Sequence, residues 1–266
     1  MTAAAAQRRI IDRLRIQDFR FVEIESKRRV VPEEMADLRA FILSRKRVKH
    51  AKAGFFFDQF LDTPDNSLFR KGASLRLRYK RDGTAVYLQY KGPGFHRGGV
   101  LYRSEFRSER LTSLLQEESH HDIIRFNQTS VAGILAQHRG TPIEQAMRSH
   151  LGEATLRRIT VGPIISMYQK DKFVVDLGHV FLEPSLDRVY AFRIGRGGVH
   201  PLSTFCEYEN EVKAKRGFED EKLDYIEDLL EFDSRLARSF DMPHEPLDKY
   251  HRCASFFLRK SEGRRP

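Results

Sequence analysis

Short segments in which charged and apolar side chains alternate recur along most of the chain, and no other feature constrains the fold more. In FVEIESKRRV, Glu23, Glu25 and Lys27 share one phase, while Val22 and Ile24 lie between them. Successive side chains of a β-strand point to opposite faces, so each segment predicts a strand with one charged and one apolar face. The expected strands cover residues 21–30, 55–61, 74–80, 85–91, 101–109, 156–161, 164–175, 179–193 and 203–213.

Helical patterns separate some of these strands. Amphipathic helices are expected at 32–46 and 218–240, and residues 111–155 are polar, rich in histidine and without alternation. This order predicts a single α+β domain built on antiparallel strands. The expected boundaries are a basic lead-in at 1–19, one domain at 20–258 with a helical insert at about 111–155, and a loose basic tail at 259–266.

The charged faces have two readings. They could face water, as one side of an antiparallel sheet often does. However, the segments 74–80 and 85–91 offer only cations while 21–27 and 207–213 are led by carboxylates, and a solvated surface mixes the two signs. Cations two residues apart lie about 6–7 Å apart along a strand, which suits successive phosphates. The pattern therefore favours a closed sheet whose interior binds a polyanion with Arg and Lys, and a divalent metal ion with Glu.

Composition limits the kinds of binding partner and the cellular compartment that are expected for this protein. The formal net charge of +10 predicts an anionic partner: nucleic acid, a phosphorylated small molecule or anionic lipid. No nucleic-acid-binding motif is recognisable, and no segment could span a bilayer, so neither nucleic acid nor membrane is the expected partner. The two cysteines, Cys206 and Cys253, exclude a disulfide framework and a four-cysteine zinc site, and they favour the cytoplasm.

Several of these segments also resemble motifs of one family. EIESK resembles the Glu-x-Glu-x-Lys signature of CYTH domains, also called triphosphate tunnel metalloenzymes. FLDTPDNSLFRKGASLRLR is similar to the family's second block, LQYKGPG to its Lys-Gly strand end, and YRSEF to its Arg-x-Glu strand. KDKF, PSLDRV, CEYENE and PLDKYHR resemble later motifs in the same order. The resemblance covers roughly residues 20–255, apart from the insert.

The resemblance implies an eight-stranded antiparallel β-barrel (tunnel) with helices packed outside, and a triphosphate or polyphosphate ligand held with Mg²⁺ or Mn²⁺. It assigns metal binding to Glu23, Glu25, Glu207 and Glu209. It assigns phosphate binding to Lys27, Arg76, Arg78, Lys91, Arg103, Lys170 and Lys172. Glu23, Glu25 and Lys27 are also expected to be catalytic, and Glu105 and Asp187 are expected to bind metal or position water.

The chain departs from the family pattern at three positions. Lys172 stands where Arg is common, Glu211 is an additional acid on the last strand, and Asp248 replaces a Ser. These departures bear on substrate choice more than on the fold.

The leading hypothesis from the sequence is an Mg²⁺- or Mn²⁺-dependent triphosphatase acting on inorganic or organic triphosphate. An adenylate cyclase of the same family is an alternative, although no residues clearly specify an adenine pocket. A non-catalytic polyphosphate- or nucleotide-binding module is a third, but such a module gains nothing from four Glu facing its ligand. The sequence leaves the substrate open, as well as the choice between a monomer and a homodimer.

Overall fold

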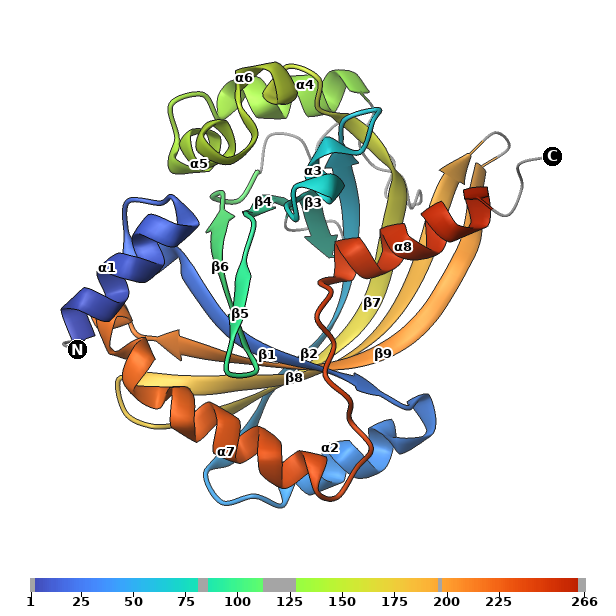
Figure 1. Ribbon diagram of the computed structural model, residues 1–266. Helices are drawn as coiled ribbons and strands as arrows, with labels where there is room; N and C mark the ends of the chain where they lie inside the picture. Colours follow the sequence, from blue (N-terminus) through green and yellow to red (C-terminus); the bar gives the residue numbers. More distant parts are fainter. Residues whose placement is uncertain (1–2, 81–85, 112–127, 196–197, 263–266) are drawn as a thin grey trace.

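The computed structural model describes residues 3–80, 86–111, 128–195 and 198–262. Within these residues, the strands form one antiparallel sheet that closes on itself (Figure 1). Eight strands follow the order β1-β9-β8-β7-β2-β3-β4-β6, and β6 pairs back with β1, so the α+β, eight-stranded prediction is confirmed. The strands are β1 (Val22–Val30), β2 (Val48–Asp62), β3 (Ser74–Lys80), β4 (Val86–Lys91), β5 (Phe95–Arg97), β6 (Val100–Arg107), β7 (Thr160–Asp176), β8 (Val180–Gly195) and β9 (Gly198–Ala214).

Strand register places the charged phases of neighbouring strands side by side. Residues directly opposite each other in an antiparallel pair point to the same face. Glu23 pairs with Arg103, and Lys27 with Glu209. The same holds around the ring, so the charged faces of all these strands point inward and the apolar faces point outward.

Helices cover the apolar outer faces. Val22 and Ile24 pack beneath Leu14 of α1 and Leu229 of α7, and α2 buries Leu38 and Ile42 against β7 to β9. The helical insert packs on the outer faces of β3, β4 and β6. The helices are α1 (Ala3–Leu14), α2 (Met35–Leu43), α3 (Ser67–Arg70), α4 (Gln128–Gln137), α5 (Pro142–Leu151), α6 (Glu153–Leu156), α7 (Ile226–Ala237) and α8 (Lys249–Glu262), with 3₁₀ turns η1 (Phe19–Phe21), η2 (Pro32–Glu34) and η4 (Glu219–Tyr225).

Helix α8 differs from the other helices because it packs on the inward phase of the sheet. Its Tyr250, Cys253 and Ala254 contact a cluster that includes Val189 and Phe205. Val189 shares the phase of Asp187, and Phe205 shares that of Glu207, so α8 fills one end of the ring, beside β7, β8 and β9 (Figure 1). The helix continues to Glu262, four residues into the range expected as a loose tail.

Some element boundaries differ from the sequence-based expectation. Strand β2 begins at Val48, seven residues before the expected start. Strand β7 runs without a break from Thr160 to Asp176, although two strands, at 156–161 and 164–175, were expected. Residues 153–156 are helical, and the short strand β5 was not expected. The expected helix at 218–240 divides into η4 and α7. Asp82-Gly83, a pair typical of a hairpin turn between the strands expected at 74–80 and 85–91, lies outside the described residues.

Candidate active site inside the tunnel

The inward faces enclose a cavity of about 410 Å³. All seven residues predicted to bind phosphate line it, together with Glu23, Glu25, Glu105 and Glu209. Asp187 and Glu207 do not line the cavity, because they are fully buried behind Lys249. The predicted residues thus share the interior of the ring, with Asp187 and Glu207 behind the cavity lining.

Arg76 and Arg78 form a rigid pair on β3. Asp58 of β2, which is fully buried, accepts hydrogen bonds from Arg76 Nη1 (2.9 Å), Arg78 Nε (2.8 Å) and Arg78 Nη2 (3.0 Å). Arg76 Nε donates to Gln89 Oε1 at 3.1 Å. Burial alone would raise the pKa of Asp58, but the charges of Arg76 and Arg78 lower it. The two guanidinium groups are thus held in fixed orientations before a ligand arrives.

Arg103 of β6 joins three carboxylates. Its Nε donates to Glu23 at 2.6 Å, one Nη to Glu25 at 2.7 Å, and the other Nη to Asp248 at 2.9 Å. Lys91 donates to both oxygens of Glu23. Burial raises the pKa of Glu25, whereas for Glu23 the charges of Arg103 and Lys91 outweigh burial and lower the pKa.

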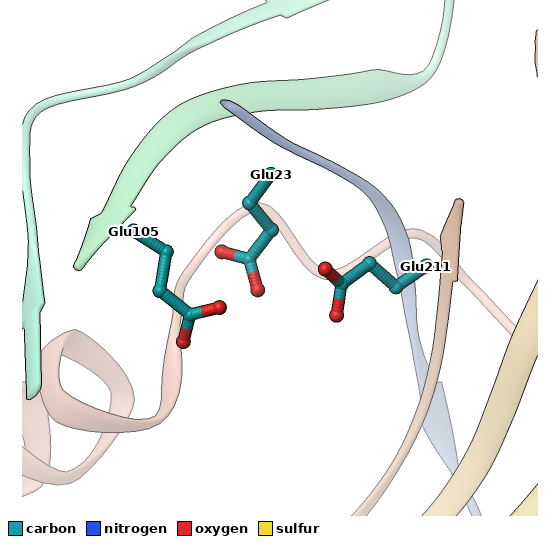
Figure 2. A group of neighbouring side chains, drawn as sticks. All are labelled: Glu23, Glu105 and Glu211. Atoms are coloured by element: carbon teal, nitrogen blue, oxygen red, sulfur yellow. The ribbon is translucent and has the colours of Figure 1, made fainter. Parts of the chain in front are cut away.

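A first acidic cluster lies at the junction of β1, β6 and β9. Carboxylate oxygens of Glu23, Glu105 and Glu211 lie within 4.8 Å of one another, and Figure 2 shows the three groups converging. Burial is the main cause that raises the pKa of Glu211 to about 8. The contact with Lys213 opposes this shift, and the charges of Glu23 and Glu105 add to it. Such a set of hard oxygen donors with excess negative charge suits Mg²⁺ or Mn²⁺.

A second acidic cluster consists of Asp187, Glu207 and Glu209, again within 4.8 Å of one another. The ammonium of Lys249, the first residue of α8, lies 2.7 Å from Asp187, 2.5 Å from Glu207 and 2.7 Å from Glu209. The predicted metal set therefore divides. Glu23 belongs to the first cluster, Glu207 and Glu209 belong to the second, and Glu25 belongs to neither.

Sequence reasoning gave no site role to several residues of this site, among them Glu211, which it noted only as an additional acid. Asp58 received no role because it is the one charged residue of its expected strand at 55–61, where it shares the phase of Phe56 and Phe60. Asp248 and Lys249 lie in the PLDKYHR segment, which resembles a family motif, but the sequence analysis assigned neither residue a role in the site. The cavity wall also includes Tyr168, whose ring lies 5.4 Å from Lys249 Nζ.

Comparison with known proteins identifies the family. The model of the CYTH domain family matches residues 22–240, so the chain belongs to that family. No curated protein sequence matches the chain.

Three solved structures resemble this chain at low sequence identity. A proposed adenylyl cyclase from Hippeastrum, described as having a dominant triphosphatase activity, has a TM-score of 0.57 and 18% identity over 88% of this chain and 95% of that one. A candidate adenylate cyclase from Bacillus halodurans has a TM-score of 0.49 and 15% identity over 85% and 94%. The Mimivirus capping enzyme triphosphatase has a TM-score of 0.44 and 10% identity over 88% and 97%. At 18% identity, the similarity to the Hippeastrum structure establishes the fold of this chain and nothing about its activity.

Among the described residues, no helix combines the length and the apolar character needed to cross a membrane.

Proposed function

We propose that this CYTH protein is a metal-dependent phosphohydrolase that removes the terminal phosphate from inorganic triphosphate or from an organic or nucleoside triphosphate. One observation carries the proposal: the same cavity has both a wall of Arg and Lys and the acidic cluster of Glu23, Glu105 and Glu211. Phosphoryl transfer needs both, because catalysis is mainly positioning and neutralisation of charge on phosphate oxygens.

The cation wall would bind the phosphate chain. Arg76 and Arg78 are two residues apart on one strand, and each points a preoriented guanidinium into the cavity. Lys91 of the neighbouring strand β4 and Lys170 of β7 also line the cavity. Preorganised cations in a site with little water bind a polyanion more strongly than mobile surface cations do.

The first acidic cluster would hold the metal ion through Glu23, Glu105 and Glu211. When bound, Mg²⁺ or Mn²⁺ supplies charge neutralisation for the phosphate oxygens. Glu105 is the most exposed of the three, with 22% of its side chain accessible, so its carboxylate is placed to orient a water molecule.

A phosphate-release screen tests the proposal. The wild-type protein is incubated with tripolyphosphate, ATP, GTP or thiamine triphosphate, with Mg²⁺ or Mn²⁺. We expect release of orthophosphate from at least one substrate. Glu23→Gln and Glu211→Gln should each reduce kcat by at least about 100-fold, a loss comparable to removal of one group that stabilises the transition state. Glu227→Gln, on the exposed face of α7, is the matched control and should retain full activity.

Other outcomes would assign other functions. Full activity in Glu23→Gln and Glu211→Gln would refute the site. Formation of cyclic AMP and pyrophosphate from ATP would identify a cyclase. Tight binding of tripolyphosphate without turnover under either metal would identify a binding module.

A further inference from the structure

The second acidic cluster is already neutralised by side chains of the protein. Lys170 Nζ lies 3.0 Å from Asp187 and 2.8 Å from Glu209, and Lys27 Nζ lies 2.8 Å from Glu209. With Lys249, three ammonium groups face the three carboxylates of Asp187, Glu207 and Glu209. The guanidinium of Arg252 also lies 3.7 Å from Glu207. Asp187 and Glu207 are fully buried, so a divalent cation added here would leave uncompensated positive charge in a region of low dielectric constant.

The first cluster has the opposite imbalance. Glu23, Glu25, Glu105, Glu211 and Asp248 form one connected group, and within the described residues their Lys and Arg contacts are Lys91, Arg103 and Lys213. Five carboxylates thus meet three cations. His251 also contacts Asp248, and even its protonation would leave one negative charge in excess. A divalent cation would relieve this excess.

Lys249 is held in place by the docking of α8. Its side chain is 5% exposed, and its Nζ lies over the ring of Tyr168, which is fully buried. The next residue, Tyr250, donates a hydrogen bond of 2.5 Å to Asp62, which also accepts backbone hydrogen bonds from the start of α3. This end of α8 is therefore anchored to β2 and α3, which fixes the backbone position from which Lys249 reaches the second cluster.

From these contacts we propose that Lys249 is a built-in cation that takes the place of a second metal ion, so that the tunnel binds one divalent cation, at Glu23, Glu105 and Glu211. The inference deepens the proposed function and rests on it only for the presence of a divalent cation. It changes the predicted role of Glu207 and Glu209: they hold α8 and its lysine, and they do not hold metal in the wild-type protein.

Counting bound Mn²⁺ tests the inference without any turnover. Free Mn²⁺ is measured by electron paramagnetic resonance during titration of the purified protein, in a buffer free of phosphate. We expect one bound Mn²⁺ per wild-type chain. Removal of the ammonium in Lys249→Gln should raise the count to two, because Lys249 contacts all three carboxylates of the second cluster. In addition, Asp187 Oδ1 has no hydrogen-bond partner among the described residues.

Two further variants keep the test decisive. Lys49→Gln is the matched control, because Lys49 is exposed on β2 and belongs to neither cluster, and the count should stay at one. In Lys249→Gln/Glu207→Gln, one acid and the ammonium are removed together, so charge balance is kept and the count should also stay at one. Glu211→Gln should weaken the wild-type site by at least about 10-fold.

Two results would overturn the inference: two tightly bound Mn²⁺ in the wild-type protein, or a count of one in a folded Lys249→Gln protein. Circular dichroism establishes whether that variant is folded. If it is not, the wild-type count and the charge-balanced double variant decide the question. This test is independent of the test of the proposed function. A protein that binds one Mn²⁺ and releases no phosphate would refute the phosphohydrolase activity and leave the metal count in place.

Discussion

Asp58 shows how a single buried carboxylate can organise a phosphate-binding wall. It accepts three hydrogen bonds from Arg76 and Arg78, and none of its surface is exposed. The arginines still face the cavity, where a phosphate could take their remaining donors. Asp58 thus fixes the direction of both guanidinium groups while reducing the net charge of the wall.

Replacement of Asp58 by Asn should destabilise the empty protein. A buried ion pair that loses one partner costs about 3–5 kcal/mol, and Asn can recover part of this with its carbonyl oxygen. We expect a loss of about 3 kcal/mol in the free energy of unfolding, measured by urea denaturation. Tripolyphosphate should restore more stability in this variant than in the wild type, because phosphate oxygens can replace the lost carboxylate.

A surface carboxylate gives the matched control for this experiment. Asp12→Asn removes an exposed ion pair with Arg8 on α1, which contributes little. If Asp58→Asn proved as stable as Asp12→Asn without ligand, Asp58 would not have the proposed orienting role.

At the scale of elements, helix α7 positions β1 and β9, the strands that carry Glu23, Glu25, Glu209 and Glu211. Asp233 of α7, fully buried, accepts hydrogen bonds from Ser26 Oγ of β1 and from Tyr208 Oη and Asn210 Nδ2 of β9. Ser26 lies between Glu25 and Lys27, and Asn210 lies between Glu209 and Glu211. One helical side chain therefore locks the two strands that supply most of the interior carboxylates.

The start of α8 depends on a histidine that we expect to be protonated below neutral pH. His251 Nδ1 lies 2.7 Å from Asp248, and Nε2 lies 3.1 Å from the carbonyl oxygen of Phe69. Burial and the charge of Arg103 lower the pKa of His251, but the carboxylate of Asp248 outweighs them and raises it. The imidazolium can donate to both oxygens at once, and neutral imidazole cannot.

This arrangement predicts a pH-dependent contribution to stability. Because the pKa of His251 in the folded protein is above its ordinary value of 6.5, the contribution is complete below pH 6.5 and is lost as pH rises through the folded-state pKa. His251→Gln should therefore reduce the free energy of unfolding at pH 6 by about 1–2 kcal/mol more than at pH 9. Denaturant titrations at the two pH values measure the difference, and an equal effect at both would contradict the assignment.

At the scale of the whole molecule, closure of the sheet concentrates charge. Twelve Lys and Arg side chains and seven carboxylates line the cavity. Asp58, Asp187 and Glu207 lie behind that lining and compensate part of the difference. The empty tunnel keeps an excess of positive charge, so a polyanion that fills it should stabilise the fold.

Tripolyphosphate should accordingly stabilise the wild-type protein much more than orthophosphate at the same concentration. A ligand at 100 times its Kd adds about 2.7 kcal/mol to the free energy of unfolding. Thermal denaturation with each anion, with and without Mn²⁺, measures the effect. Equal shifts in Tm for the two anions would indicate general screening of charge and not occupation of a tunnel.

The sequence by itself determined that the strands have one charged face, that these faces segregate cations from carboxylates, and that the chain follows the CYTH pattern. Those features are local, because strand phase depends only on the alternation of side chains. It did not reveal α8, which lies beyond the last expected helix. The apolar positions Tyr250, Cys253 and Ala254 also do not indicate whether such a helix packs inside or outside the ring.

Only the tertiary structure decided which opposite charges meet. Strand register and ring closure bring Glu23 to Glu105 and Glu211 and leave that group short of positive charge, while the docking of α8 delivers Lys249 to Asp187, Glu207 and Glu209. These residues are distant along the chain, and the energy of a buried charge depends on its neighbours in space. The alternating pattern therefore determined that carboxylates point inward, and the fold determined which of them are available to a metal ion.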